Sequence, residues 1–142
     1  MEKDIIIEIS GMQDYEGQDP DNVELVTSGK FAEKSDGIYI TYEESELTGM
    51  DSTTTTLKIE PERVTIMRFG QTRSHMIFEI GQKHLSHYDT PFGSFTIGIC
   101  THSVDKKITA AGGKIEIHYS MEINNALAGE NSFSLKFRNA SN

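Results

Sequence analysis

The most restrictive feature of the sequence is a long stretch, residues 88–125, in which apolar and polar residues alternate. Apolar residues recur at every second position in two runs, 95–99 and 115–123, with polar residues between them. A period of two is typical of a β-strand that buries one face. A loop ending in Gly112-Gly113 separates the two runs, so the stretch predicts a β-hairpin.

Similar patterns elsewhere predict about eight further strands, separated by turn signals rich in Gly, Pro, Asp and Asn. These strands are expected at residues 5–12, 23–34, 38–43, 53–59, 64–70, 72–80, 84–88 and 131–138. The only helix candidate is a short turn near 126–128, and Asn124 and Asn125 are expected to cap or turn the chain. The pattern therefore predicts an all-β protein.

Short turns between consecutive strands favour a meander, and a meander this long either keeps two bare edges or closes on itself. We therefore expect residues 1–142 to form one domain, a closed or nearly closed antiparallel up-and-down barrel of about 8–10 strands. Gly29 interrupts the middle of a predicted strand, which indicates a bulge or a sharp bend.

Composition limits the function. Lys and Arg number 13 against 22 Asp and Glu, giving a net charge of −9, so nucleic-acid binding as a main function is disfavoured. The single cysteine excludes an intrachain disulfide, the N-terminus lacks a signal-peptide layout, and no apolar run approaches the length of a membrane helix. We expect a cytoplasmic protein that does not associate with membranes.

Arg68 is the most informative single residue. It lies in register with Val64 and Ile66, so the face that buries apolar groups also carries a guanidinium. Glu44 shares a face with Tyr42 and is a candidate partner. An inward arginine can bind a ligand carboxylate or phosphate in bidentate fashion. The alternatives are a structural ion pair, or a side chain at a strand end that reaches solvent.

Three tyrosines and one threonine complete the candidate ligand-binding set. Tyr42, Tyr88 and Tyr119 lie on or beside apolar faces and could line a pocket, although core packing explains them as well. Thr90 belongs to a Thr-Pro-Phe-Gly segment that is either a functional loop or an ordinary turn.

Metal, cofactor and catalytic signatures are weaker. Cys100, His102 and His118 can share a strand face, but the apolar residues of this hairpin occupy the other face. We therefore expect these three residues on the exterior, with no metal site and no cofactor. The sequence has no phosphate-binding glycine loop, nucleophile elbow or zinc-protease helix, which disfavours an enzyme without excluding one.

Several of these residues also carry a resemblance. The segments Arg68-x-Gly70, Phe78-x-x-Gly81 and Tyr88-x-Thr90-Pro91-x-Gly93, preceded by an acidic segment at 42–44, resemble the signature of the YwiB-like family. These are small bacterial proteins of unknown function, similar in fold to the calycins, the class that includes lipocalins. The resemblance implies a closed barrel and suggests ligand binding in the lumen, but it implies no activity.

Two functions remain open at this point. The first is binding of a small molecule, anionic or amphipathic, in or at the mouth of the barrel. The second is a structural or protein-interaction barrel that acts as a homodimer through strand edges. A lumen filled by side chains such as Phe31, Phe78 and Phe133 would argue against the first, and a monomeric molecular weight by light scattering would count against the second.

Overall fold

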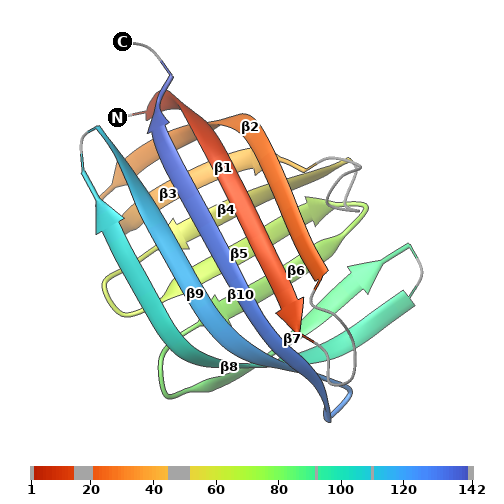
Figure 1. The fold of residues 1–142 in the computed structure, drawn as a ribbon. Helices are drawn as coiled ribbons and strands as arrows, with labels where there is room; N and C mark the ends of the chain where they lie inside the picture. The colour runs from red at the N-terminus through yellow and green to blue at the C-terminus, as the bar shows by residue number, and fades with distance from the viewer. Residues whose placement is uncertain (1, 15–20, 45–51, 92, 110, 141–142) are drawn as a thin grey trace.

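Ten antiparallel strands close into a barrel in the computed structural model, which describes residues 2–14, 21–44, 52–91, 93–109 and 111–140 (Figure 1). The strands are β1 (Glu2–Asp14), β2 (Asp21–Lys34), β3 (Gly37–Glu43), β4 (Thr53–Ile59), β5 (Val64–Gly70), β6 (Arg73–Phe78), β7 (Lys83–Thr90), β8 (Gly93–Ile108), β9 (Gly112–Ile123) and β10 (Ala126–Asn139). Each strand pairs with the next along the chain, and β1 pairs with β10 to close the sheet. The predicted all-β, up-and-down barrel is confirmed.

Figure 1 shows how the strands wrap around the core. Strands β1, β8, β9 and β10 form the front wall in this view, and β3 to β6 form the wall behind them. Strand β2 curves from the front wall to the rear, and both termini lie at the same end of the barrel. The long front strands extend past the shorter rear strands, so the hairpin of β7 and β8 projects at one side.

Alternation places one set of side chains inside the barrel. Along β4, Thr53, Thr55, Leu57 and Ile59 are buried while the residues between them are partly exposed. The apolar core draws on nearly every strand and includes Ile5, Ile7, Ile40, Leu57, Val64, Ile66, Phe78, Ile99, Ile115, Ile117 and Leu135. Burying these side chains is the main stabilising contribution to the fold, since each contributes about 1.5–3 kcal/mol.

A β-bulge in β8 changes which residues point inward. Thr101 pairs with Tyr119 and Ser103 pairs with His118, so His102 is the additional residue on β8. Odd-numbered residues face inward before the bulge, whereas Val104 packs against the core after it. The bulge therefore lets β8 continue to Ile108 without turning its apolar face to solvent.

The short turn at 126–128, the only helix candidate in the sequence, is part of a strand, because β10 begins at Ala126 and pairs there with Ile123. Asn124 and Asn125 have φ values of 50° and 70°, and such a pair of left-handed residues forms a tight hairpin turn. The turn expected at these asparagines is confirmed. None of the described residues forms a helix that is long and apolar enough to cross a membrane.

The barrel wall is incompletely hydrogen-bonded between β6 and β7. Strands β6 and β7 pair only through Arg73 with Asp89 and Ser74 with Tyr88. Beyond these pairs, residues 75–78 of β6 and 83–87 of β7 are not paired with one another, until an isolated bridge joins Ile80 to Thr101. We call this unpaired stretch the β6–β7 seam. The ladder is also irregular elsewhere among the described strands: register shifts occur between Thr101 and Ser103 in β8 and between Leu127 and Gly129 in β10, and β2 pairs with β3 only from Gly29 to Lys34.

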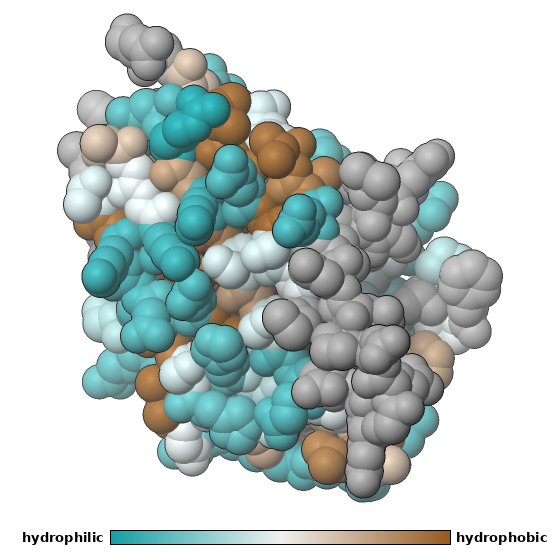
Figure 2. Space-filling model, viewed as in Figure 1, coloured by the Kyte–Doolittle hydropathy of each residue, from teal (hydrophilic) through white to brown (hydrophobic). Residues whose placement is uncertain are grey.

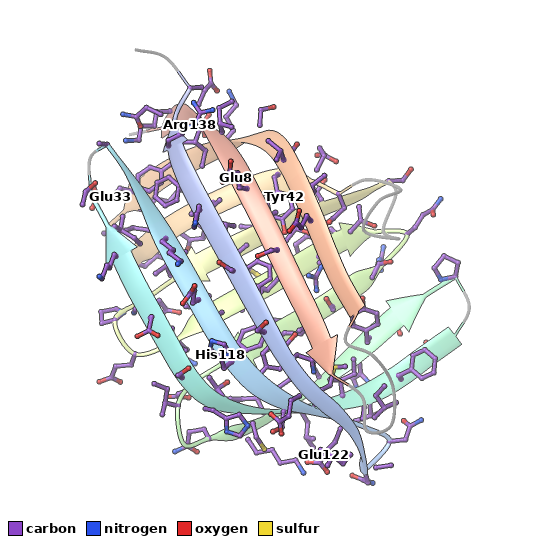
Figure 3. The ribbon with its side chains drawn as sticks, viewed as in Figure 1. Glu8, Glu33, Tyr42, His118, Glu122 and Arg138 are labelled. Carbon is purple, nitrogen blue, oxygen red and sulfur yellow. The ribbon has the colours of Figure 1, made fainter. Side chains whose placement is uncertain are left out.

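The outer surface opposite the seam is largely hydrophilic. Figure 2 shows the face formed by β1, β9 and β10, where polar side chains dominate and apolar ones appear as separate small patches. Figure 3 labels Glu8, His118, Glu122 and Arg138 on strands of this front wall. An outer face of this kind accords with the acidic composition.

Gly29 is required because neighbouring atoms approach its backbone closely, and not because the strand has a bulge there. The pairing of β2 with β1 and β3 runs through Gly29 without a shift in register. A Cβ atom at this position would lie 2.5 Å from Ile7 Cδ1 and 2.6 Å from the Thr41 carbonyl oxygen. The bulge considered for this position is therefore wrong, whereas β2 does curve strongly as a whole. The glycine allows the strands to stay in register at this point.

We expect the substitution Gly29→Ala to lower the free energy of unfolding by about 2 kcal/mol, because the backbone must shift to admit the methyl group. Gly11→Ala in β1 is the matched control, since its Cβ would meet nothing closer than the Ser132 carbonyl oxygen at 3.7 Å. The control is expected to change stability by less than about 0.5 kcal/mol. Urea denaturation of both variants measures this, and equal effects would refute the explanation.

Candidate functional site

Five inward residues form a continuous row across five strands near one end of the barrel. Tyr42 pairs with Thr55, Thr55 with Arg68, Arg68 with Ser74, and Ser74 with Tyr88. Because cross-strand partners point to the same face, all five side chains are directed into the barrel. The row brings three of the predicted site residues, Tyr42, Arg68 and Tyr88, into one neighbourhood.

The Arg68 side chain is almost fully enclosed, with 9% of its surface exposed, and it lies beside Glu44. Its Nε atom is 4.0 Å from Glu44 Oε1, which is a charge contact but too long for a hydrogen bond. Thr55 Oγ1 donates a hydrogen bond of 2.7 Å to the same carboxylate oxygen. The structure thus contains the ion pair that the strand alternation predicts.

The guanidinium is incompletely hydrogen-bonded. Arg68 Nη1 donates to Met76 Sδ at 3.6 Å, and sulfur is a weak acceptor. The buried Nε atom has no hydrogen-bond partner among the described residues. Ser74, which pairs directly with Arg68 and is 7% exposed, likewise has a buried hydroxyl group without a partner in the described part of the chain. Two neighbouring polar groups are therefore left with unused hydrogen-bonding capacity.

A groove of about 820 Å³ opens beside these two groups. It follows the β6–β7 seam, and its lining includes Arg68, Phe69, Arg73, Ser74, Ile77 and Leu85. Arg68 and Ser74 are buried whereas Phe69 and Leu85 are exposed, so the polar pair lies at the inner side of the groove and the apolar residues at its outer side. This volume is within the range of small-molecule pockets.

Tyr42 adds a neutral hydroxyl to the same environment. Figure 3 labels it on β3, and its side chain is buried within the barrel. Burial raises the pKa of the Tyr42 phenol well above its ordinary value, and the negative charge of Glu44 raises it further, while Arg68 acts in the opposite direction. Tyr42 therefore stays protonated throughout the physiological range.

The remaining predicted site residues lie elsewhere or only adjoin the site. Tyr88 is half-buried and packs against the core. Tyr119 contacts Phe78 edge to face, with ring centroids 4.8 Å apart, and belongs to the core around β9. The side chain of Thr90 lies outside the described residues, although its backbone pairs with Gly93 across the turn.

Three contributors to the site were not predicted. Thr55, Ser74 and Met76 contact or adjoin Arg68, and each lies in an ordinary alternating strand. The only sequence signal that could have found them is the alternation of inward and outward positions along a strand, because each of these residues occupies an inward position. Which inward residues oppose Arg68 depends on the register between strands, and the sequence does not specify that directly.

The barrel interior beyond this row is filled. Phe31, Phe78 and Phe133 are buried in the core, as are Ile97 and Ile117. This is the condition that argues against a ligand held deep in the lumen. Buried polar groups without a hydrogen-bond partner among the described residues occur at Arg68 and Ser74, beside the groove along the β6–β7 seam, and also at Thr101 on β8 and Asn131 on β10.

The exterior residues considered for metal binding make other contacts. His102 Nε2 lies 2.6 Å from Ser120 Oγ and 3.2 Å from Glu130 Oε2, and Ser120 Oγ donates to the other oxygen of Glu130 at 2.8 Å. Cys100 is partly exposed and pairs with Ser120 across the ladder. His102 thus takes part in a surface network that joins β8, β9 and β10.

The fold and this row define the class of protein as a small closed antiparallel β-barrel with a buried arginine beside a lateral groove. Residues 7–135 match the model of a family described as a domain of unknown function, DUF1934, and the chain belongs to that family.

Two comparisons, one of sequence and one of structure, support this assignment. The chain is 26% identical over 101 residues to the uncharacterized beta-barrel protein YwiB of Bacillus subtilis (strain 168), covering 71% of this chain and 70% of that protein. It also matches the crystal structure of the ywiB protein from Bacillus subtilis with a TM-score of 0.86 at 20% identity, over 99% of this chain and 94% of that one. The second comparison shows that the fold is shared.

We expect Arg68→Met to lower the free energy of unfolding by about 3 kcal/mol, because it leaves the Glu44 carboxylate buried without its cation. The double substitution Arg68→Met with Glu44→Gln is expected to recover most of this loss, since the amide oxygen can still accept from Thr55. Arg138→Met, on the outer face of β10, is the matched control. Urea denaturation that finds the single variant as stable as the control would show that the pair is not needed.

The free energy of unfolding is expected to fall as pH rises above 10.0, the ordinary pKa of tyrosine. Because the folded pKa of Tyr42 is raised, the unfolded chain releases this proton first, so rising pH favours unfolding. Tyr42→Phe should reduce the slope of stability against pH between about 10 and 11.5, even if it changes stability at neutral pH. Denaturant titrations across this range measure the slope, and an unchanged slope would contradict the assignment.

Proposed function

We propose that this protein binds a small anionic molecule through Arg68, at the end of the barrel where the β6–β7 seam opens. The observation that carries the proposal is the pair of buried, underused polar groups, Arg68 Nε and Ser74 Oγ, beside a groove of about 820 Å³. The comparisons support a β-barrel family without an established function, so the argument rests on the site itself.

Energetics favour a ligand at this position. A buried polar group without a hydrogen-bond partner costs about 1–3 kcal/mol, and more when the group is charged. A ligand oxygen placed between Arg68 and Ser74 would supply acceptors to both. Arginine is well suited to this task, because its planar guanidinium can donate two parallel hydrogen bonds to a carboxylate or phosphate.

The charge distribution makes the position selective. The chain carries a net charge of −9, so its surface repels anions in general. At the groove, Glu44 balances much of the charge of Arg68 and Asp89 lies opposite Arg73 in the ladder, so the donors of Arg68 and Ser74 favour an anion there more than net charge does. An anion that enters the groove is therefore held by local donors and not by the average field of the protein.

The alternative function, a homodimer formed through strand edges, has less support. Its motivation was the acidic surface and the unpaired strand edges that an imperfect barrel leaves; β1 and β10 pair with each other, which leaves the unpaired stretch between β6 and β7 as a candidate edge. The calycin likeness concerns fold alone and adds no argument for a particular ligand. A cytoplasmic location and a non-enzymatic role remain part of this proposal.

Titration with the anionic apolar dye anilinonaphthalene sulfonate tests the proposal. Wild type is expected to bind with increased, blue-shifted dye fluorescence, and the Arg68→Met/Glu44→Gln double variant to bind about tenfold or more weakly, as expected for loss of a charge-assisted pair. Arg138→Met should bind as wild type does. Circular dichroism confirms that each variant is folded, which excludes dye binding to a molten state.

Two outcomes would contradict the proposal. One is equal dye affinity in wild type and the double variant. The other is the absence of dye binding together with no stabilisation of the protein by octanoate in thermal unfolding. Native mass spectrometry of protein purified from its own host adds a direct measurement, because a retained anionic molecule should be present in wild type and lost from the double variant.

A further inference from the structure

We propose that the ligand is a monocarboxylate with an apolar body, and that this body lies in the groove on the outer side of the β6–β7 seam, against Ile77 and Leu85. The inference rests on the proposed function, since it takes the anion at Arg68 as given. It adds the number of charges that the ligand carries, the kind of body it has and the direction in which that body points.

The polar inner side of the groove favours a single negative charge. Glu44 lies 4.0 Å from Arg68 Nε and is held by Thr55, so the charge of the arginine is already largely balanced before a ligand arrives. A monoanion brings one excess negative charge to this position, whereas a phosphate monoester brings nearly two and meets stronger repulsion from Glu44. At the rim, Arg73 and Asp89 oppose one another in the ladder and add little net charge.

The donors also suit a carboxylate in shape. Arg68 and Ser74 are direct cross-strand partners, whose Cβ atoms are about 5 Å apart in such pairs. A guanidinium edge and a hydroxyl group carried by neighbouring side chains could donate to the two oxygens of one planar carboxylate. No rearrangement of the strands is needed, because both side chains already line the groove.

The body of the ligand is apolar, because three large apolar side chains, Phe69, Ile77 and Leu85, line the groove, although polar residues such as His75 and His87 line it as well. Leu85 is 68% exposed and Phe69 is 61% exposed, while Ile77 is partly exposed on the opposite side of the seam. Side chains of this size gathered around one concavity are typical of a binding site for an apolar group. Their contact with water would be reduced by a ligand body lying between them.

The body cannot extend inward. Phe78 and Met76 lie behind the seam on β6 and belong to the packed core, together with Ile66 on β5. A chain entering the lumen would have to displace these side chains, which costs more than it gains in a well-packed interior. The carboxylate therefore points inward to Arg68 and the body points outward along the seam.

A series of carboxylates tests the inference by isothermal titration calorimetry with wild-type protein. Acetate, butanoate, hexanoate and octanoate share one head group, so affinity should rise by up to about fourfold per methylene until the groove is filled. Octyl phosphate, which has the same body and a larger charge, is expected to bind more weakly than octanoate. All ligands are used below the concentrations at which they form micelles.

Leu85→Ser is the informative variant, because Leu85 is exposed and its loss should leave the fold intact. It should weaken octanoate about fivefold or more and leave acetate unchanged. Leu127→Ser is the matched control, since Leu127 is 71% exposed and lies on β10 outside the groove lining. This control should bind both ligands as wild type does.

The outcomes separate the inference from the function on which it rests. If acetate and octanoate bind equally and both depend on Arg68, the anion site stands and the apolar body is refuted. If octyl phosphate binds more tightly than octanoate, the preference for one charge is refuted. If no carboxylate binds and the Arg68→Met/Glu44→Gln variant changes nothing in dye binding, the anion site fails as well.

Discussion

Antiparallel pairing between the first and last strands is the interaction on which the structure depends. β1 and β10 pair continuously from Ile5 with Asn139 to Asp14 with Glu130, and this pairing turns a meander into a closed wall. Closure gives every strand an inside and an outside, so the alternation of each strand assigns its side chains to core or solvent. A polar side chain at an inward-facing position of a strand can then reach the surface only at the ends of the barrel or at a break in its wall.

Arg68 illustrates the consequence of this constraint. Its parity matches that of Val64 and Ile66, so closure carries the guanidinium into the barrel even though its transfer from water is unfavourable. Glu44 and Thr55 compensate for part of that cost, but their geometry leaves the Nε atom without a hydrogen bond among the described residues. A purely structural ion pair would be expected to satisfy its buried donors, because half-satisfied polar networks destabilise a core. The incomplete pairing is what directs attention to a ligand.

The features that could be predicted from sequence are those that depend on local periodicity. The positions of ten strands, the inward orientation of Arg68 and its partner Glu44 all follow from a period of two within single strands. Features set by register between strands could not be predicted, such as the pairing of Ser74 with Arg68 or the bulge at His102. The Ala-Leu-Ala segment at 126–128, the only helix candidate in the sequence, begins β10 instead, because pairing with β9 outweighs the helix propensity of alanine and leucine.

The β6–β7 seam connects the fold to the proposed function. A barrel with a filled interior has no room for a ligand in its lumen, and a completely hydrogen-bonded wall exposes none of its inward polar groups. Here the wall pairs fully on both sides of the seam, through β5 with β6 and β7 with β8, but only briefly across it. The two pairs that remain, at Arg73 and Ser74, hold the strands together directly beside Arg68. The β6–β7 seam lies one strand away from Arg68, whose guanidinium is buried and incompletely hydrogen-bonded. The seam gives the guanidinium access to the groove, so a barrel with a filled core can still hold a binding site.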